Sequence, residues 1–287
     1  MRCDLHVHTR HSGMCTVPVM NRVCRESYNH PEAVYEALKR QGMDLVTITD
    51  HDSIGAAESL RHHEDFFLSE EVTCRTPRGT ELHVGVYGIS ERDHVEMQRR
   101  REDLPAFVAY LEEKRLLFSI NHAFSGLTGR RTSADFEDFA EAFPAMETRN
   151  GAMLALANRH ASALAERWGK AVVGGSDAHT MAGLGQTYTE VEGARSAREF
   201  IQGLKQARGR VAGASGSYAK LTRAVTHIAM QMMKETPWTL ALAPLIALVP
   251  AVTLVNLILE IEFAQRWGRR TAQVVSPVQV PVALERV

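Results

Sequence analysis

The sequence predicts an α/β fold with a mainly parallel sheet. As far as about residue 213 of the 287, short apolar runs rich in β-branched residues alternate with amphipathic segments of helical period. Repeated strand-then-helix units are typical of parallel sheets covered by helices. Because about seven such units can be counted, a closed or nearly closed barrel is favoured, followed by a C-terminal helical extension. A doubly wound open sheet is the alternative.

The expected strands are short apolar runs, several of which end in polar residues. The first run ends at the polar turn 9–13, and the run LVTIT at 45–49 is followed directly by Asp50-His51-Asp52. A turn at 77–79 separates two longer runs. In chain order the expected strands are 4–8, 45–49, 66–74, 81–89, 117–121, 145–148, 171–175 and 188–191.

The expected helices lie between these strands. The first of them has Pro31 at its start and Gly42 just after its end, the residues preferred at those two places. In chain order the expected helices are 31–40, 104–114, 135–142, 155–168, 197–207 and 219–235. No GxGxxG or GxxxxGK[ST] pattern follows the first strand, so neither a nucleotide cofactor nor a P-loop is predicted.

Composition is that of an ordinary globular protein. Hydrophobic residues make up 45% and charged residues 23%, which excludes a disordered chain, a collagen-like fibre and a bundle of many membrane spans. The formal net charge of −1 disfavours a nucleic-acid partner bound through phosphate neutralisation. The four cysteines include no CxxC pair, so they predict neither a disulfide framework nor a zinc finger and favour a reducing compartment.

The strand and helix alternation stops at a Gly/Ser/Ala-rich stretch, 209–217. The expected organisation is therefore a first domain over 1–213, a helical connector over 214–237, an apolar helical segment over 238–262 and a tail over 263–287.

The apolar segment contains an uncharged run, 239–259, that is just long enough to cross a hydrocarbon core as a helix. Trp and basic residues flank both of its ends, as they do in membrane segments. With no signal peptide at the N-terminus, this predicts a cytoplasmic protein attached to the inner face of the cytoplasmic membrane. Pro244 and Pro250 allow a kinked segment that dips into the membrane as well as a single crossing. A buried helix or a homo-oligomer interface is the alternative.

The residues that suggest chemistry lie mostly at or near the carboxyl ends of the expected strands. His6 and His8 are two positions apart on one strand, so their imidazoles point to the same side and can share a metal ion. In a parallel barrel such strand ends converge on one face. The further members of this set are His51, Glu71, His83, His122, Asp177 and His179. Imidazole with carboxylate suits Zn, Mn or Fe, so a metal centre is expected there.

These residues resemble the ordered motifs of the PHP (polymerase and histidinol phosphatase) family. The matching segments are Asp4-Leu5-His6-Val7-His8-Thr9, Thr49-Asp50-His51-Asp52, Glu71 before Val72, His83, His122 and Gly175-Ser176-Asp177-Ala178-His179. The resemblance covers roughly 1–213 and implies a distorted seven-stranded β/α barrel with two or three divalent metal ions. It further implies a first metal held by His6, His8, Glu71 and Asp177, a second by Glu71, His83 and His122, and a third by His51 and His179.

One position departs from the family pattern. The first motif of the family usually continues as Ser-Asp-Gly, and its Asp is a ligand of the third metal. Here Ser12 is followed by Gly13, and His11 and Cys15 are the candidates to replace that Asp.

The expected function is a metal-dependent phosphoesterase that hydrolyses a phosphomonoester or nucleotide phosphate. Two neighbouring cations lower the pKa of a bridging water and hold phosphoryl oxygens. His179 or His51 is expected to donate the leaving-group proton, with Asp52 orienting one of them. Arg75 and Arg149, near strand ends, are the candidates to bind the phosphate.

Two other functions stay open at this stage. A PHP-type exonuclease on nucleic-acid ends is disfavoured by the near-neutral charge and by the lack of interleaved basic and aromatic residues. A non-catalytic sensor or scaffold at a membrane is disfavoured by the nearly complete set of metal ligands.

Overall fold

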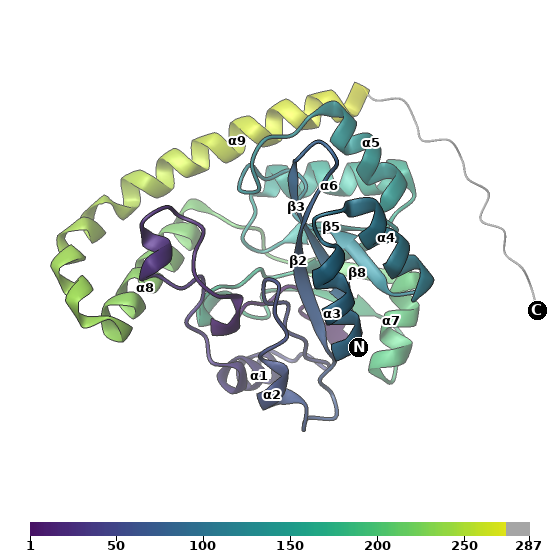
Figure 1. Ribbon diagram of the computed structural model, residues 1–287, viewed down its shortest axis with the longest axis horizontal. Helices are drawn as coiled ribbons and strands as arrows, with labels where there is room; N and C mark the ends of the chain where they lie inside the picture. The colour runs from purple at the N-terminus through teal and green to yellow at the C-terminus, as the bar shows by residue number, and fades with distance from the viewer. Residues whose placement is uncertain (274–287) are drawn as a thin grey trace, which may run out of the picture.

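The computed structural model describes residues 1–273, which form a mixed α/β fold (Figure 1). The strands are β1 (Arg2–Cys3), β2 (Ser69–Arg75), β3 (Glu81–Tyr87), β4 (Leu117–Ile120), β5 (Ala145–Asn150), β6 (Ala171–Gly175), β7 (Thr187–Val191) and β8 (Gly209–Gly213). The helices are α1 (Pro31–Arg40), α2 (Ala57–Leu60), α3 (Glu91–Arg100), α4 (Leu104–Glu113), α5 (Ser133–Ala142), α6 (Ala155–Trp168), α7 (Ala197–Lys205), α8 (Tyr218–Glu235) and α9 (Val249–Gln273). Short 3-10 helices are η1 (Arg10–Ser12), η2 (Met20–Arg22) and η3 (Met181–Gly183), and a longer one is η4 (Pro237–Leu248).

The strands form two sheets that are only partly parallel. The larger sheet has the order β2-β3-β4-β5-β6, and the smaller has the order β1-β7-β8. In the larger sheet β4, β5 and β6 are parallel, whereas β2 and β3 pair antiparallel with their neighbours. The smaller sheet is antiparallel throughout. The α/β class and the C-terminal helix are therefore confirmed, whereas the two sheets of the described residues do not confirm the distorted seven-stranded β/α barrel.

The expected strands 4–8 and 45–49 are the main difference from the sequence prediction. Each segment forms a single isolated bridge, Val7 with Ala178 and Val46 with Phe66. Side-chain oxygens accept backbone N–H groups that a ladder would use: Asp4 accepts from His6 N–H, and Thr49 accepts from Val7 N–H. The bond from His6 to Asp4 is local, and such bonds compete with sheet formation.

The main core lies between the larger sheet and the helices that cover it. Helices α4, α5 and α6 contribute Phe107, Phe136 and Leu164, all buried. The second half of α9 joins the same core through Trp267, whose ring stacks on Phe136 with 5.3 Å between centroids. Figure 1 shows α9 running across α5 and α6. The first part of the expected tail is thus helical and packed, and residues 274–287 lie outside the described residues.

Helix α8, η4 and the first half of α9 form a helical hairpin that projects from the sheets (Figure 1). Its α8 arm is held by Glu235, which pairs with Arg25 at 3.0 Å, and by Met232, which packs against the loop around Cys24. Much of its outer surface is apolar and exposed, at Trp238, Leu240, Leu245, Leu248, Val252, Leu254, Val255, Ile258 and Leu259. The stretch Pro237–Ala272 is long and apolar enough to cross a membrane, by length and composition alone.

Candidate metal centre

Glu71 lies at the middle of the candidate metal centre. Strand β2 alternates its side chains, so Glu71 faces the centre while Glu70 faces the opposite side and pairs with His94. The Oε1 atom of Glu71 is 3.2 Å from Nε2 of His122, and its Oε2 atom is 3.1 Å from Nε2 of His6. Three further imidazoles approach this carboxylate: His51 Nδ1 at 3.3 Å, His8 Nε2 at 3.5 Å and His83 Nδ1 at 3.6 Å. One buried carboxylate therefore contacts five imidazoles.

Asp177 is the second carboxylate of the centre. Its Oδ1 atom is 3.3 Å from His8 Nε2, 3.5 Å from His6 Nε2 and 3.5 Å from His179 Nδ1. The structure thus brings together all eight side chains for which the sequence suggested metal binding. They form four overlapping sets whose ligand atoms lie within 4.8 Å of one another: His6-His8-Asp177, His6-Glu71-His122, His51-Glu71-His83 and His8-His51-His179.

Two of these residues occupy strained backbone conformations. Asp177 has a φ of 50° and His122 a φ of 28°, in the region that favours glycine. Each such conformation costs on the order of 1–3 kcal/mol and persists only where the surroundings enforce it. The backbone N–H of Asp177 donates to the carbonyl of His6, and the N–H of His122 donates to the carboxylate of Glu147. These bonds hold both side chains at the centre.

The hydrogen bonds of the first two histidines are those of metal ligands. Nδ1 of His6 is 2.7 Å from Oε1 of Glu147, and Nδ1 of His8 is 3.0 Å from Oγ of Ser12, which in turn donates to Asp50. With the proton placed on Nδ1 in each ring, both Nε2 lone pairs face the carboxylates. Metal-binding histidines commonly donate their other N–H to a carboxylate or similar acceptor in this way.

The charges of the centre also fit a divalent cation. Burial alone would raise the pKa of Glu71, but the imidazoles of His6 and His83 hold it well below its usual value. Burial and the neighbouring imidazoles hold the pKa of His8 well below the usual value, which favours the neutral form that binds metal. Nε2 of His8, with Nδ1 of His51 and of His83, is buried without a hydrogen-bond partner in the described structure. Orphaned imidazole nitrogens around ionised carboxylates suit Zn, Mn or Fe.

Three residues that sequence reasoning missed support the centre. Glu147 contacts His6 and His122 as described, and Asn121 donates from Nδ2 to Glu71 Oε1 at 2.8 Å. Asn150 donates from Nδ2 to Asp177 Oδ2 and to Glu147 Oε2, both at 3.0 Å. All three lie on or directly after strands of the larger sheet, so the strand-end criterion that selected His122 would also have found them.

Glu26 occupies the region where the family pattern predicts the missing acid. Its Oε1 atom is 3.8 Å from Nε2 of His51 and 3.9 Å from Nε2 of His179. The two replacements considered from the sequence lie elsewhere: His11 lies against Gly55, and Cys15 packs beside the cluster of Cys24 and Met232. Glu26 follows an irregular loop with no periodic pattern, and nothing in its local sequence marks it.

Three other predicted site residues are not brought to the centre. The contacts of Asp52 are with Arg101 and with the N–H of Thr73 at 2.9 Å. Arg75 is 53% exposed and pairs with Glu81 and Glu102. It lies four residues beyond Glu71 on the strand, roughly 13 Å along it, which explains why it does not reach the site. Arg149 donates to the carbonyl of Gly213 at 2.8 Å instead.

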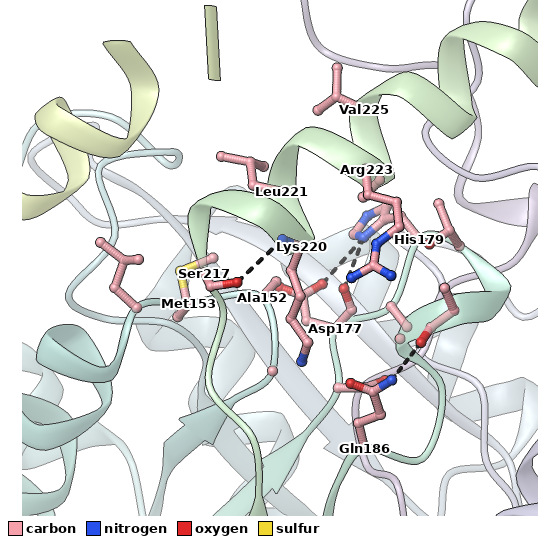
Figure 2. Close-up of a pocket in the computed structure, with 18 of the residues that line it drawn as sticks. Ala152, Met153, Asp177, His179, Gln186, Ser217, Lys220, Leu221, Arg223 and Val225 are labelled. Carbon is pink, nitrogen blue, oxygen red and sulfur yellow. Dashed lines mark hydrogen bonds and ion pairs between the residues drawn. The ribbon is translucent and has the colours of Figure 1, made fainter. Parts of the chain in front are cut away.

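A cavity of about 280 Å³ adjoins Asp177 and His179. Helices α8 and α9 form part of its wall, and Figure 2 shows Lys220 and Arg223 projecting toward the side where Asp177 and His179 lie. Burial lowers the pKa of Lys220. Among the described residues neither basic side chain forms an ion pair. The basic side chains beside the centre therefore belong to the segment 214–237, which the sequence analysis treats as a connector. Arg75 and Arg149, near the strand ends, do not supply them.

A family-model match agrees with the resemblance to the PHP family that the sequence motifs suggested. Residues 155–208 match the PHP_C family model, described as PHP-associated. This match supports a PHP-domain family for the chain. An uncharacterised protein of Methanocaldococcus jannaschii is 31% identical over 67 residues. That match covers 23% of this chain and 38% of the relative, so it spans less than half of the relative's length.

Solved structures resemble this chain at low sequence identity. PsfC from Pseudomonas syringae superposes with a TM-score of 0.55 at 17% identity, covering 82% of this chain and 98% of that one. A lesion-specific endonuclease from Pyrococcus furiosus superposes with a TM-score of 0.49 at 18% identity, covering 74% of this chain and 58% of that one. At this identity the likeness to PsfC shows the fold alone.

Proposed function

We propose that this PHP protein is a metal-dependent phosphoesterase that hydrolyses a phosphomonoester. The observation that carries the proposal is the pair of buried carboxylates, Glu71 and Asp177, surrounded by six imidazoles, with Asp177 lining a cavity that also holds two basic side chains. Divalent ions held by such donors lower the pKa of water and neutralise charge on a phosphoryl group. We propose two or three such ions, of Zn, Mn or Fe, with Glu26 completing the group of His51 and His179.

The basic side chains of the cavity are proposed to bind the phosphate. Lys220 and Arg223 enter the cavity from α8 and have no acidic partner among the described residues. Cation–phosphate hydrogen bonds are short and strong, so these two groups can orient the substrate above Asp177. They take the role that the sequence suggested for Arg75 and Arg149.

His179 is the better placed of the two proposed proton donors. It lines the cavity and is 23% exposed, whereas His51 is 14% exposed and lies between Glu71 and Glu26. A general acid must reach the leaving-group oxygen of a bound substrate, and only a side chain at the cavity wall can do so. We therefore assign the leaving-group proton to His179 in the form of the enzyme that holds two ions and none on this imidazole, and give Asp52 no part in it.

We also propose that the apolar hairpin contacts a membrane surface from one side. Helix α8 starts beside β8, and the second half of α9 packs back into the core through Trp267. Both ends of the hairpin are thus held on the same side of the molecule. This geometry favours a segment that lies in the interface over one that crosses the bilayer. The alternative occupant of the apolar surface is a second copy of this chain.

A substrate panel tests the proposed activity. The full chain, purified in mild detergent and supplied in turn with Zn²⁺, Mn²⁺ and Fe²⁺, is expected to release inorganic phosphate from at least one phosphomonoester. Chelation should reduce the rate to background, and adding the metal back should restore it, because the nucleophile and the charge neutralisation both depend on the ions. Degradation of single-stranded DNA ends without phosphomonoester turnover would favour the exonuclease alternative, and turnover of neither would favour a non-catalytic scaffold.

A further inference from the structure

We infer that the substrate is amphiphilic: a phosphomonoester whose phosphate lies at the metal centre and whose apolar tail lies between α8 and α9. The inference rests on the phosphoesterase activity proposed above and names the class of molecule on which it acts. Three features of the cavity support it: one charged end, a mostly apolar wall, and a position beneath the exposed apolar surface of the hairpin.

The charged end of the cavity suits an anionic group such as a phosphate. Asp177 and His179 belong to the metal centre, and Lys220 and Arg223 add two cationic groups beside it. The one additional acid in the cavity wall, Glu260, is already engaged, because its carboxylate accepts the N–H of Gly126 at 3.0 Å. An anionic group is therefore favoured at this end and only there.

The rest of the cavity has a mostly apolar wall, in which Gln186, Ser217 and Asn256 are polar. From α8 the wall is made by Leu221, Ala224, Val225 and Ile228, from α9 by Leu257, and from the loop before α6 by Met153 and Leu154. A sugar or a nucleoside needs hydrogen-bond donors and acceptors along its whole length, whereas a hydrocarbon chain needs only apolar contact. Burying a methylene group is favourable by roughly 0.8 kcal/mol, so this wall selects an apolar tail.

Helix α9 has apolar residues on two sides. Leu257 lines the cavity, while Leu254, Ile258 and Leu259 of the neighbouring turns are exposed. The tail site is thus separated from the exposed apolar surface of the hairpin by a single helix. A molecule that partitions into a membrane could reach the metal centre from that surface with its tail shielded from water.

The first experiment measures kcat/KM of the metal-loaded full chain for n-alkyl phosphates of increasing length, from methyl to octyl, as monomers in solution. We expect kcat/KM to rise by up to about fourfold per methylene until the tail fills the cavity. Equal kcat/KM values along the series would overturn the inference while leaving the phosphoesterase activity intact. Failure to hydrolyse any member, methyl phosphate included, would contradict the proposed activity itself.

Two variants locate the tail. Leu257→Gln and, from the facing helix, Leu221→Gln are expected to flatten the dependence on chain length. Leu259→Gln, the same change two residues away on the exposed side of α9, is expected to keep the wild-type slope. Circular dichroism checks that each variant is folded. A wild-type slope in both cavity variants would place the tail elsewhere and overturn the inference.

A second experiment, with lipid vesicles, shows whether the substrate resides in a membrane or is dissolved in water. Phosphatidic acid presented in phosphatidylcholine vesicles is compared with octyl phosphate in solution. Hydrolysis of both supports a membrane-resident substrate, and hydrolysis of octyl phosphate alone supports a soluble amphiphile.

Discussion

Replacing Glu71 by Gln is expected to lower phosphomonoester turnover by at least about 100-fold and to reduce the metal content of the chain. Glu71 is fully buried, and its two oxygens contact five imidazoles. The amide keeps the shape of the side chain but removes the charge that attracts the cations. It also places an N–H₂ donor against imidazole nitrogens that otherwise accept metal.

The matched control is Glu70→Gln. Glu70 is the adjacent residue, is equally buried, and faces the opposite side of β2, where it pairs with His94. The same substitution there should leave the metal content unchanged and turnover within about tenfold of the wild type, since it touches no proposed ligand. Turnover is measured as phosphate release at saturating metal. Wild-type turnover in Glu71→Gln would show that the chemistry occurs at another site.

Replacing Trp267 by Ala is expected to lower the free energy of unfolding by about 3–5 kcal/mol. Trp267 is 4% exposed, and its ring stacks on Phe136 in the main core. The substitution removes a large buried ring and leaves a cavity between α9 and α5. Urea unfolding in mild detergent, followed by circular dichroism, measures the change.

Trp238→Ala is the control for this loss. Trp238 lies in the exposed part of the hairpin and is 64% exposed, so its removal should change the free energy of unfolding by no more than about 0.5 kcal/mol. Equal effects of the two substitutions would mean that α9 is not part of the core. In that case a chain ending before α8 would fold by itself, as the boundary expected near residue 213 implies.

The grouping of these eight side chains could be predicted because its geometry follows from local rules. His6 and His8 are separated by one residue in extended backbone, so they share a side, and Glu71 and Glu70 are neighbours on a strand, so they do not. Asp177 and His179 directly follow a buried strand, β6, at the edge where its parallel partners also end. The residues of the centre are therefore recognisable one strand at a time.

The pairing of the first expected strand and the proposed phosphate-binding residues could not be predicted in the same way. Side-chain oxygens of Asp4 and Thr49 accept the N–H groups of His6 and Val7, and Thr49 lies in a segment far from Val7 in the chain. Arg75 has the right chemistry but the wrong distance from Glu71 along β2. Lys220 lies in a helix that the sequence presents as a connector, and only its packing over the cavity brings it to the centre.

The packing of α9 on the core could not be predicted from the sequence either. Trp267 reads in sequence as one of the Trp and basic residues that flank a membrane segment, and in the structure it packs on Phe136, more than a hundred residues earlier in the chain. No local pattern distinguishes these two roles, since both place an aromatic ring next to an apolar helix.

Elemental analysis of the wild-type full chain, purified without chelators and then dialysed against trace-metal-free buffer, tests the central claim most directly. The arrangement around Glu71 and Asp177 predicts about two or three tightly held divalent ions per chain, and clearly fewer in Glu71→Gln. A wild-type chain that carries no divalent ion, and takes up none from Zn²⁺, Mn²⁺ or Fe²⁺ at neutral pH, would contradict it.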